Sequence, residues 1–206
     1  IHCCPVKLTR PVTNWYYSTS NHDTSSNKVH TMRLTQGQQA PAFATTDLYD
    51  AAISSHELKG KKVLLSFYRY ASCPFCNLRF HSLSKKQQEW RDKGLELIAV
   101  FQSPTSSILE YAGKDYSPVR IIPNPSRDLY RLYGVEGSWK GFLTGSLQFG
   151  TFAKALKEGH LPGKVEGDMN MIPADFVIDE QGKILIAYYG KDISDHLEIC
   201  EIEKVI

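Results

Sequence analysis

Residues 62–80 of the chain read KVLLSFYRYASCPFCNLRF, and this stretch decides the fold. Its first part, 62–68, is a short, uninterrupted apolar run of the kind expected for a strand that is buried on both faces. From Pro74 onward the large apolar residues recur with a helical period, and the pattern stops at Gly94, a residue type common at helix ends. We therefore expect a buried strand that leads through a short loop into a long helix over 74–93.

The rest of the domain repeats this alternation of strand and helix. Strand patterns occur at 95–101, 119–122, 175–179 and 183–189, and helix patterns occur at 105–112, at 126–133 and after a Ser194 cap. Such alternation predicts a parallel core sheet with helices on its faces, to which the closing hairpin around Gln181 adds antiparallel strands. The segment around 134–164, rich in glycine and phenylalanine, is interpreted as an inserted loop and helix segment. The predicted fold class is α/β, with a central mixed sheet flanked by helices.

Composition places the chain among ordinary globular proteins. Its 206 residues are 42% hydrophobic and carry a net charge of +2 without a dense run of Lys or Arg, so neither nucleic acid nor a membrane is an expected partner. No apolar run approaches the roughly 20 residues of a membrane-spanning helix. The N-terminal stretch also lacks the basic and apolar layout of a secretory signal. These features favour a cytoplasmic location.

The cysteines are few and unevenly spaced. They are Cys3, Cys4, Cys73, Cys76 and Cys200. A structural disulfide framework usually has an even and denser set. The one close pair within the domain, Cys73 and Cys76, therefore suggests reactive thiols, and the sequence assigns no role to Cys200.

Residues 1–35 differ in character from the rest of the chain. Their middle, 18–27, is nearly all Ser, Thr, Asn and Asp, and such a segment buries too little apolar surface to offset the entropy of ordering. We expect a disordered leader or a non-native extension over 1–35 and one folded domain over 36–206. A metal-binding or redox tail built on Cys3 and Cys4 is the alternative.

The motif Cys73-Pro74-Phe75-Cys76 lies where the predicted strand ends and the helix begins. Pro74 suits the first helical position, where no N–H is needed, and this places Cys73 at the N-cap and Cys76 at the third helical position. A sulfur at the N-cap accepts backbone N–H groups and feels the positive end of the helix dipole. Both effects favour the thiolate, which is the nucleophilic form. We expect Cys73 to be the more exposed, low-pKa nucleophile and Cys76, one turn deeper, to be the resolving thiol.

Two other interpretations of this cysteine pair are a zinc half-site and a pair of inert buried thiols. A zinc site needs two further ligands at suitable spacing, but the sequence has no second C-x-x-C, and His81 lies elsewhere on the helix. The order strand, C-P-x-C, helix favours redox chemistry. Arg69 and Arg79 are near in sequence and add positive potential. We expect neither a metal nor a cofactor.

Several stretches together carry a family resemblance. They are GQQAPAF at 37–43, LKGKKVLLSFYR at 58–69, SCPFCNL at 72–78, LYGV at 132–135, and DFVID at 175–179 with GKI at 182–184. Through them residues 36–206 resemble the AhpC/TSA-type, peroxiredoxin-like family of the thioredoxin fold. The resemblance implies a thioredoxin-like fold and a thiol–disulfide oxidoreductase with peroxide-reducing activity. It also implies a peroxide or disulfide substrate and an external dithiol reductant such as thioredoxin or glutathione.

The site departs from the family pattern around its cysteines. True peroxiredoxins resemble P-x-x-x-T/S-x-x-C around the cysteine that reacts with peroxide. With Cys76 in that slot, Cys73 replaces Thr and Arg69 replaces Pro; with Cys73 there, Tyr70 and Ser66 fall on those positions. The scaffold is therefore peroxiredoxin-like, while the site is closer to thioredoxin, and the peroxiredoxin register keeps Cys76 as the rival nucleophile. A non-catalytic binding module on the same fold and a zinc-binding scaffold are the alternatives from other functional classes.

A proline precedes the strand pattern at 175–179, in the turn Met171-Ile172-Pro173-Ala174. In thioredoxin-like proteins a cis-proline precedes the matching strand and packs against the C-x-x-C. The resemblance therefore implies that the Ile172–Pro173 bond is cis and that Pro173 adjoins the cysteine motif as part of the site.

A truncation tests the proposed domain boundary. Because 18–27 has no apolar pattern, a chain that starts at Met32 should keep its melting temperature within a few degrees of the full chain. Differential scanning calorimetry of both chains measures this. A drop of more than about 5 °C would show that the removed residues pack on the domain.

Overall fold

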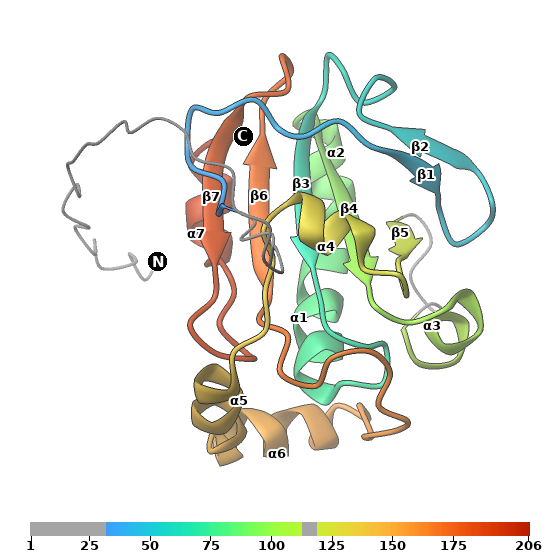
Figure 1. Cartoon of the computed structure of the whole chain (residues 1–206), viewed down its shortest axis with the longest axis vertical. Helices are drawn as coiled ribbons and strands as arrows, with labels where there is room; N and C mark the ends of the chain where they lie inside the picture. The colour runs from blue at the N-terminus through green and yellow to red at the C-terminus, as the bar shows by residue number, and fades with distance from the viewer. Residues whose placement is uncertain (1–31, 113–118) are drawn as a thin grey trace, which may run out of the picture. The chain divides into compact units, whose positions relative to one another are not determined.

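The computed structural model describes residues 32–112 and 119–206. The predicted leader therefore falls almost wholly outside the described residues. The central feature is a five-stranded mixed sheet, in the order β5-β4-β3-β6-β7 (Figure 1). Its strands are β3 (Lys62–Phe67), β4 (Leu95–Phe101), β5 (Arg120–Pro123), β6 (Ala174–Ile178) and β7 (Ile184–Tyr189).

Strand β3 is the middle of the sheet. It pairs parallel to β4 and antiparallel to β6, so the parallel and antiparallel halves meet along it. Its residues alternate between two buried clusters, with Leu64 on one face and Val63, Leu65 and Phe67 on the other. The run of apolar residues that predicts a buried strand therefore serves two cores at once, one on each face.

Helices cover both faces of the sheet (Figure 1). The helices are α1 (Pro74–Ser84), α2 (Gln87–Asp92), α3 (Thr105–Tyr111), α4 (Asp128–Leu132), α5 (Trp139–Ser146), α6 (Phe149–Lys157) and α7 (Ile199–Glu203). Phe80 of α1, Trp90 of α2 and Ile202 of α7 belong to the first cluster, and Leu129 and Tyr130 of α4 belong to the second. The predicted α/β class with a mixed sheet flanked by helices is confirmed. No helix in the described part of the chain is long and apolar enough to cross a bilayer.

The single helix predicted over 74–93 is wrong, because the chain breaks it into α1 and α2. The hydroxyls of Ser82 and Ser84 donate to the carbonyls four residues earlier, a pattern that bends helices. The Lys86 N–H then bonds to the Leu83 carbonyl, only three residues back, and this tightened turn ends the first helix.

The last helix also begins later than predicted. Ser194 does not cap it, because its amide and hydroxyl both donate to Asp192 Oδ1, and α7 starts only after Glu198. The Leu197 N–H donates to the Asp175 carboxylate at 2.9 Å, which holds the connection to the sheet and delays the helix.

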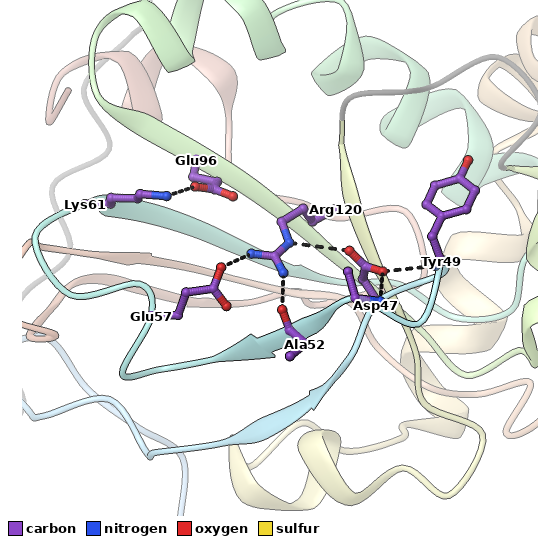
Figure 2. Close-up of polar contacts among 8 residues, drawn as sticks. Asp47, Tyr49, Ala52, Glu57, Lys61, Glu96 and Arg120 are labelled. Atoms are coloured by element: carbon purple, nitrogen blue, oxygen red, sulfur yellow. Dashed lines mark hydrogen bonds and ion pairs between the residues drawn. The ribbon is translucent and has the colours of Figure 1, made fainter.

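The sequence patterns did not predict the small hairpin β1 (Ala44–Thr46) and β2 (Ala52–Ser54). Three-residue strands are too short to show a period. Arg120 at the start of β5 holds this hairpin (Figure 2). Its guanidinium lies 2.8 Å from Glu57 Oε1 and 3.5 Å from Asp47 Oδ2, and it donates to the Ala52 carbonyl at 2.5 Å.

The predicted insert around 134–164 folds as the two helices α5 and α6, at the end of the sheet where β3 runs into α1 (Figure 1). Ser138 caps α5 by accepting the Gly141 N–H at 3.1 Å. A Cβ on Gly141 would meet the Lys191 carbonyl at 2.6 Å, and one on Gly145 would meet Ile193 Cγ1 at 2.5 Å. These glycines therefore allow α5 to lie directly on the loop after β7.

One carboxylate is buried in the sheet. Asp175 of β6 accepts the Ser66 hydroxyl at 2.5 Å, and its other oxygen lies 3.0 Å from His196 Nδ1. Burial alone raises the pKa of the Asp175 carboxyl, but the His196 ring, the Arg79 charge and the Ser66 hydroxyl outweigh it and lower the pKa to about 2. The carboxylate joins β3, β6 and the segment that leads to α7.

This network makes a prediction about acid stability. A lowered pKa stabilises the fold above the unfolded value of 3.8, and that contribution disappears as the pH falls toward about 2. Asp175→Asn should therefore lower the free energy of unfolding by about 2 kcal/mol at pH 6, and the deficit should shrink between pH 5 and about 2.

Urea denaturation across this pH range measures the difference. Asp128→Asn, which removes a carboxylate that is 67% exposed, is the matched control. A deficit in Asp175→Asn that stays constant with pH would show that the ionised carboxylate contributes nothing.

Candidate active site

The loop between β3 and α1 is held from both sides. The Tyr130 hydroxyl donates to the Tyr68 carbonyl at 2.5 Å, and the Ser103 hydroxyl accepts the Ala71 N–H at 2.8 Å. The Asn77 amide, on α1 itself, donates to the Ala71 carbonyl at 2.7 Å. The start of α1 therefore has a fixed position relative to β3.

The structure places Cys73 at the N-cap of α1. Its backbone is extended, with φ −78° and ψ 118°, and Pro74 occupies the first turn. Its sulfur accepts the Cys76 N–H at 3.4 Å, the contact that the N-cap position predicts for a thiolate. Both cysteines of the motif are free thiols.

Arg69 is the cation that reaches the motif. Its Nη2 lies 2.8 Å from Cys73 Sγ, and its Nη1 donates to the Met169 carbonyl at 2.9 Å. The side chain is only 2% exposed, so the interaction lies in the protein interior. Arg79, the other candidate cation, donates instead to the Leu197 carbonyl on the other side of α1.

These contacts shift the pKa values of the two thiols in opposite directions. Burial alone raises the pKa of Cys73, but the Cys76 thiol, the Arg69 charge and the Cys76 amide stabilise the thiolate and lower the pKa to about 6. The pKa of Cys76 is raised well above its usual value by burial and by the negative charge on Cys73. Together the two shifts favour a thiolate on Cys73 over one on Cys76.

The expectation that Cys73 is the more exposed thiol is wrong. Cys73 and Cys76 are 0% and 1% exposed. The chain between α6 and β6 covers the motif, and we call residues 164–169 the cover segment. The Ser72 hydroxyl donates to the Lys164 carbonyl at 2.5 Å, and the Phe75 ring packs on Phe152 of α6 with ring centroids 5.9 Å apart.

Other side chains at the same end of the sheet hold the cover segment. Gln102, just after β4, accepts the Asp168 N–H at 2.9 Å, and Ser107 of α3 donates to Glu166 at 2.7 Å. Arg127 pairs with the Asp168 carboxylate. No sequence pattern predicts this arrangement, because the groups that reach the loop around Cys73 are backbone carbonyls.

Pro173 lies immediately before β6. Since Ala174 pairs with Phe67, the last residue of β3, Pro173 sits at the end of the sheet where the motif lies. The predicted cis bond is wrong, because the described residues contain no cis peptide. The Ile172 N–H donates to the Glu136 carbonyl, and the Pro173 carbonyl accepts the Gly190 N–H at 2.9 Å, so hydrogen bonds hold the backbone on both sides of a trans bond.

One cavity lies away from the motif. It has a volume of about 410 Å³ and is lined by Phe43, Leu58, Tyr133 and Ile178, and neither Cys73 nor Cys76 contributes to it. Across residues 32–112 and 119–206, no three His, Cys, Asp or Glu side chains converge in the way a metal ion requires. The two thiols with shifted pKa values make the motif, rather than the cavity, the candidate active site.

Comparison with known proteins identifies the family of the chain. The sequence model of the AhpC/TSA family matches residues 36–186. The provisionally named peroxiredoxin Rv2521 of Mycobacterium tuberculosis is 24% identical over 168 residues, which cover 81% of this chain and 92% of that protein. The thiol-disulfide oxidoreductase ResA of Bacillus anthracis is 24% identical over 164 residues, covering 79% of this chain and 74% of that one.

Solved structures share the fold. Peroxidoxin BcpB from Mycobacterium tuberculosis superposes with a TM-score of 0.58 at 15% identity, over 79% of this chain and 90% of that one. A thiol peroxidase from Chromobacterium violaceum gives a TM-score of 0.59 at 14% identity, over 84% and 87%. The thioredoxin-like fold implied by the sequence is thereby confirmed. The family match extends over most of the domain, and the chain belongs to the AhpC/TSA family as a thiol-dependent oxidoreductase.

Proposed function

We propose that the chain is a thiol–disulfide oxidoreductase with peroxide-reducing activity that works through the Cys73 and Cys76 couple. One observation carries this assignment: Arg69 Nη2 and the Cys76 amide both contact Cys73 Sγ, at 2.8 Å and 3.4 Å. A buried sulfur with two such donors is stabilised as a thiolate. Cys73 is the nucleophile and Cys76 the resolving thiol.

The reaction with a peroxide has two steps. The Cys73 thiolate attacks one oxygen of the O–O bond, becomes a sulfenic acid, and releases the other oxygen as an alkoxide or hydroxide that takes up a proton. The Cys76 sulfur then displaces water from the sulfenic acid, forming the internal disulfide. The two-electron reduction of the peroxide is thus matched by the two-electron oxidation of the dithiol.

A disulfide substrate uses the same sulfur atoms. The Cys73 thiolate attacks one sulfur of the substrate, releases the other as a thiolate, and forms a mixed disulfide. Cys76 loses its proton and attacks Cys73 Sγ, which frees the second substrate thiolate. In both reactions an external thiol reductant, either one thioredoxin dithiol or two molecules of glutathione, returns the internal disulfide to the dithiol and leaves as a disulfide itself.

Other residues position these two. Pro74 starts α1 without an N–H and so leaves the sulfur to the amide of Cys76. Arg69 stabilises the thiolate and holds the cover segment, while Ile172 and Pro173 bring the chain from that segment into β6. We propose the cytoplasm as the location, where the glutathione and thioredoxin systems keep such thiols reduced.

The first prediction here separates the two cysteines. In Cys76→Ser, Cys73 should be alkylated by iodoacetamide at pH 7 at least about ten times faster than Cys76 is in Cys73→Ser, because only Cys73 has a lowered pKa. Limited peroxide should accumulate sulfenic acid at Cys73 in the first variant, trapped with dimedone and located by mass spectrometry. Cys200, a free and partly exposed thiol, is the internal reference in both variants.

A faster Cys76 would instead support the peroxiredoxin register. Peroxide consumption and reduction of a disulfide, each measured with dithiothreitol and with thioredoxin, test the activity itself. A non-catalytic module would show neither activity, and zinc analysis of the purified protein tests the scaffold alternative.

The second prediction concerns Arg69. The alkylation rate of Cys73 in the wild-type chain should rise through pH 6 and level off above about pH 7.5, since the thiolate forms as the pH passes the lowered pKa. Arg69→Gln should move that midpoint upward by about one unit, which slows alkylation at pH 6 roughly fivefold. Arg69→Lys should shift it less, because the charge remains.

Arg131→Gln is the matched control, since it removes a guanidinium that is 60% exposed on α4. An unchanged midpoint in Arg69→Gln would show that the helix N-terminus alone stabilises the thiolate.

A further inference from the structure

Exposed apolar side chains gather on the helices and loop that close over the motif. Eight of the twelve large hydrophobic residues that the described chain exposes lie between 139 and 169. They are Trp139, Leu143, Leu147, Phe149, Leu156, Leu161, Val165 and Met169. The other four are scattered over the rest of the described residues. Single exposed apolar residues need no explanation, but a cluster of this kind marks an interaction surface.

The cluster has a defined outer side. Trp139, Leu143 and Leu147 follow each other at intervals of four residues along α5, so they form one stripe. They are 65%, 64% and 69% exposed, whereas Gly141 and Gly145 between them are buried against the loop after β7. Phe149, at the start of α6, is 73% exposed and follows directly on this stripe.

The inner side of the same helices contacts the motif. Phe152 of α6 packs on Phe75, between the two cysteines, and Ala155 is buried. The cover segment, whose carbonyls accept from Ser72 and Arg69 beside the motif, lies between α6 and β6 along the chain. A protein that exchanges thiols with Cys73 must therefore approach beside α5 and α6.

The charge of these helices is of one sign. From 137 to 157 the only charged residues are Lys140, Lys154 and Lys157, with Glu136 and Glu158 just outside. All three lysines are exposed. A second copy of this chain would bring the same three positive charges onto this surface, which disfavours self-association there. The charge instead suits an acidic partner.

We propose that the outer side of α5 and α6 is the docking surface for the protein dithiol that reduces the internal disulfide. We call Trp139, Leu143, Leu147 and Phe149, with the three lysines, the docking face. Its partner carries an apolar patch with acidic residues around its own cysteine pair. One partner thiolate attacks Cys73 Sγ and releases the Cys76 thiolate, which takes a proton. The second partner thiol resolves the mixed disulfide, and the partner leaves oxidised.

This proposal rests on the proposed function, and the test separates the two. Peroxide turnover of the full chain is measured with two reductants: thioredoxin, kept reduced by its reductase and NADPH, and dithiothreitol. Wild-type turnover should need far less thioredoxin than dithiothreitol, and its KM for thioredoxin should rise with ionic strength. Absence of turnover with dithiothreitol would refute the proposed function and the docking proposal with it.

Two variants then test the face. Leu143→Glu, and separately the double variant Lys154→Glu and Lys157→Glu, should each raise the KM for thioredoxin at least about tenfold and leave turnover with dithiothreitol within about twofold. Leu132→Glu, at a side chain on α4 that is 42% exposed and outside the face, is the control and should change neither rate.

Three results would overturn the docking proposal while leaving the redox chemistry intact. One is wild-type turnover no better with thioredoxin than with an equal concentration of dithiothreitol. Another is an unchanged KM for thioredoxin in the face variants. The third is a dimer seen by analytical ultracentrifugation, or binding to phosphatidylglycerol vesicles, that Leu143→Glu abolishes.

Discussion

The contact between the Arg69 guanidinium and the Cys73 sulfur is the constraint on which the site depends. A guanidinium that is almost fully buried is costly unless a negative group and hydrogen bonds compensate for the lost water. A buried thiolate has the same requirement. Each group therefore favours the charged form of the other, and the pair holds only while the loop after β3, the start of α1 and the Met169 carbonyl keep their positions.

The sheet topology explains why this contact forms where it does. Strand β3 is the boundary between parallel and antiparallel pairing. Its carboxyl end lies beside the start of β6, and the loop that follows it leads into α1. In α/β sheets chemistry collects at such ends of strands. The buried Asp175 lies opposite Ser66 of the same strand, so a second charged network secures the other side of α1 and the approach to α7.

The sequence predicted the fold best where a helix or strand is determined by the residues within it. The apolar run of β3, the proline after Cys73 and the strand and helix alternation are local signals, and the structure has the corresponding elements. Features decided by distant contacts were missed. The hairpin β1–β2 depends on Arg120, which lies far along the chain, and the late start of α7 depends on Asp175.

The site shows the same division. The N-cap position of Cys73 follows from Pro74 and the helix that it starts, but the neighbouring Ser72 bonds to a segment some ninety residues further along the chain. The backbone on either side of the trans bond before Pro173 likewise bonds to Glu136 and Gly190, distant partners that no local pattern reveals. Local sequence therefore predicts where Cys73 lies on its helix, whereas the surroundings of its sulfur come from tertiary structure.

The cover segment meets Arg69 and Ser72 through the carbonyl groups of Met169 and Lys164, so main-chain atoms, rather than side chains, complete the site. Every residue type supplies a carbonyl. Side chains at these two positions can therefore vary during evolution without loss of the contacts, while an insertion, a deletion or an added proline would displace the backbone. A search for invariant side chains would overlook this part of the enzyme. Among related proteins, the number of residues in the segment should be conserved more than their identity.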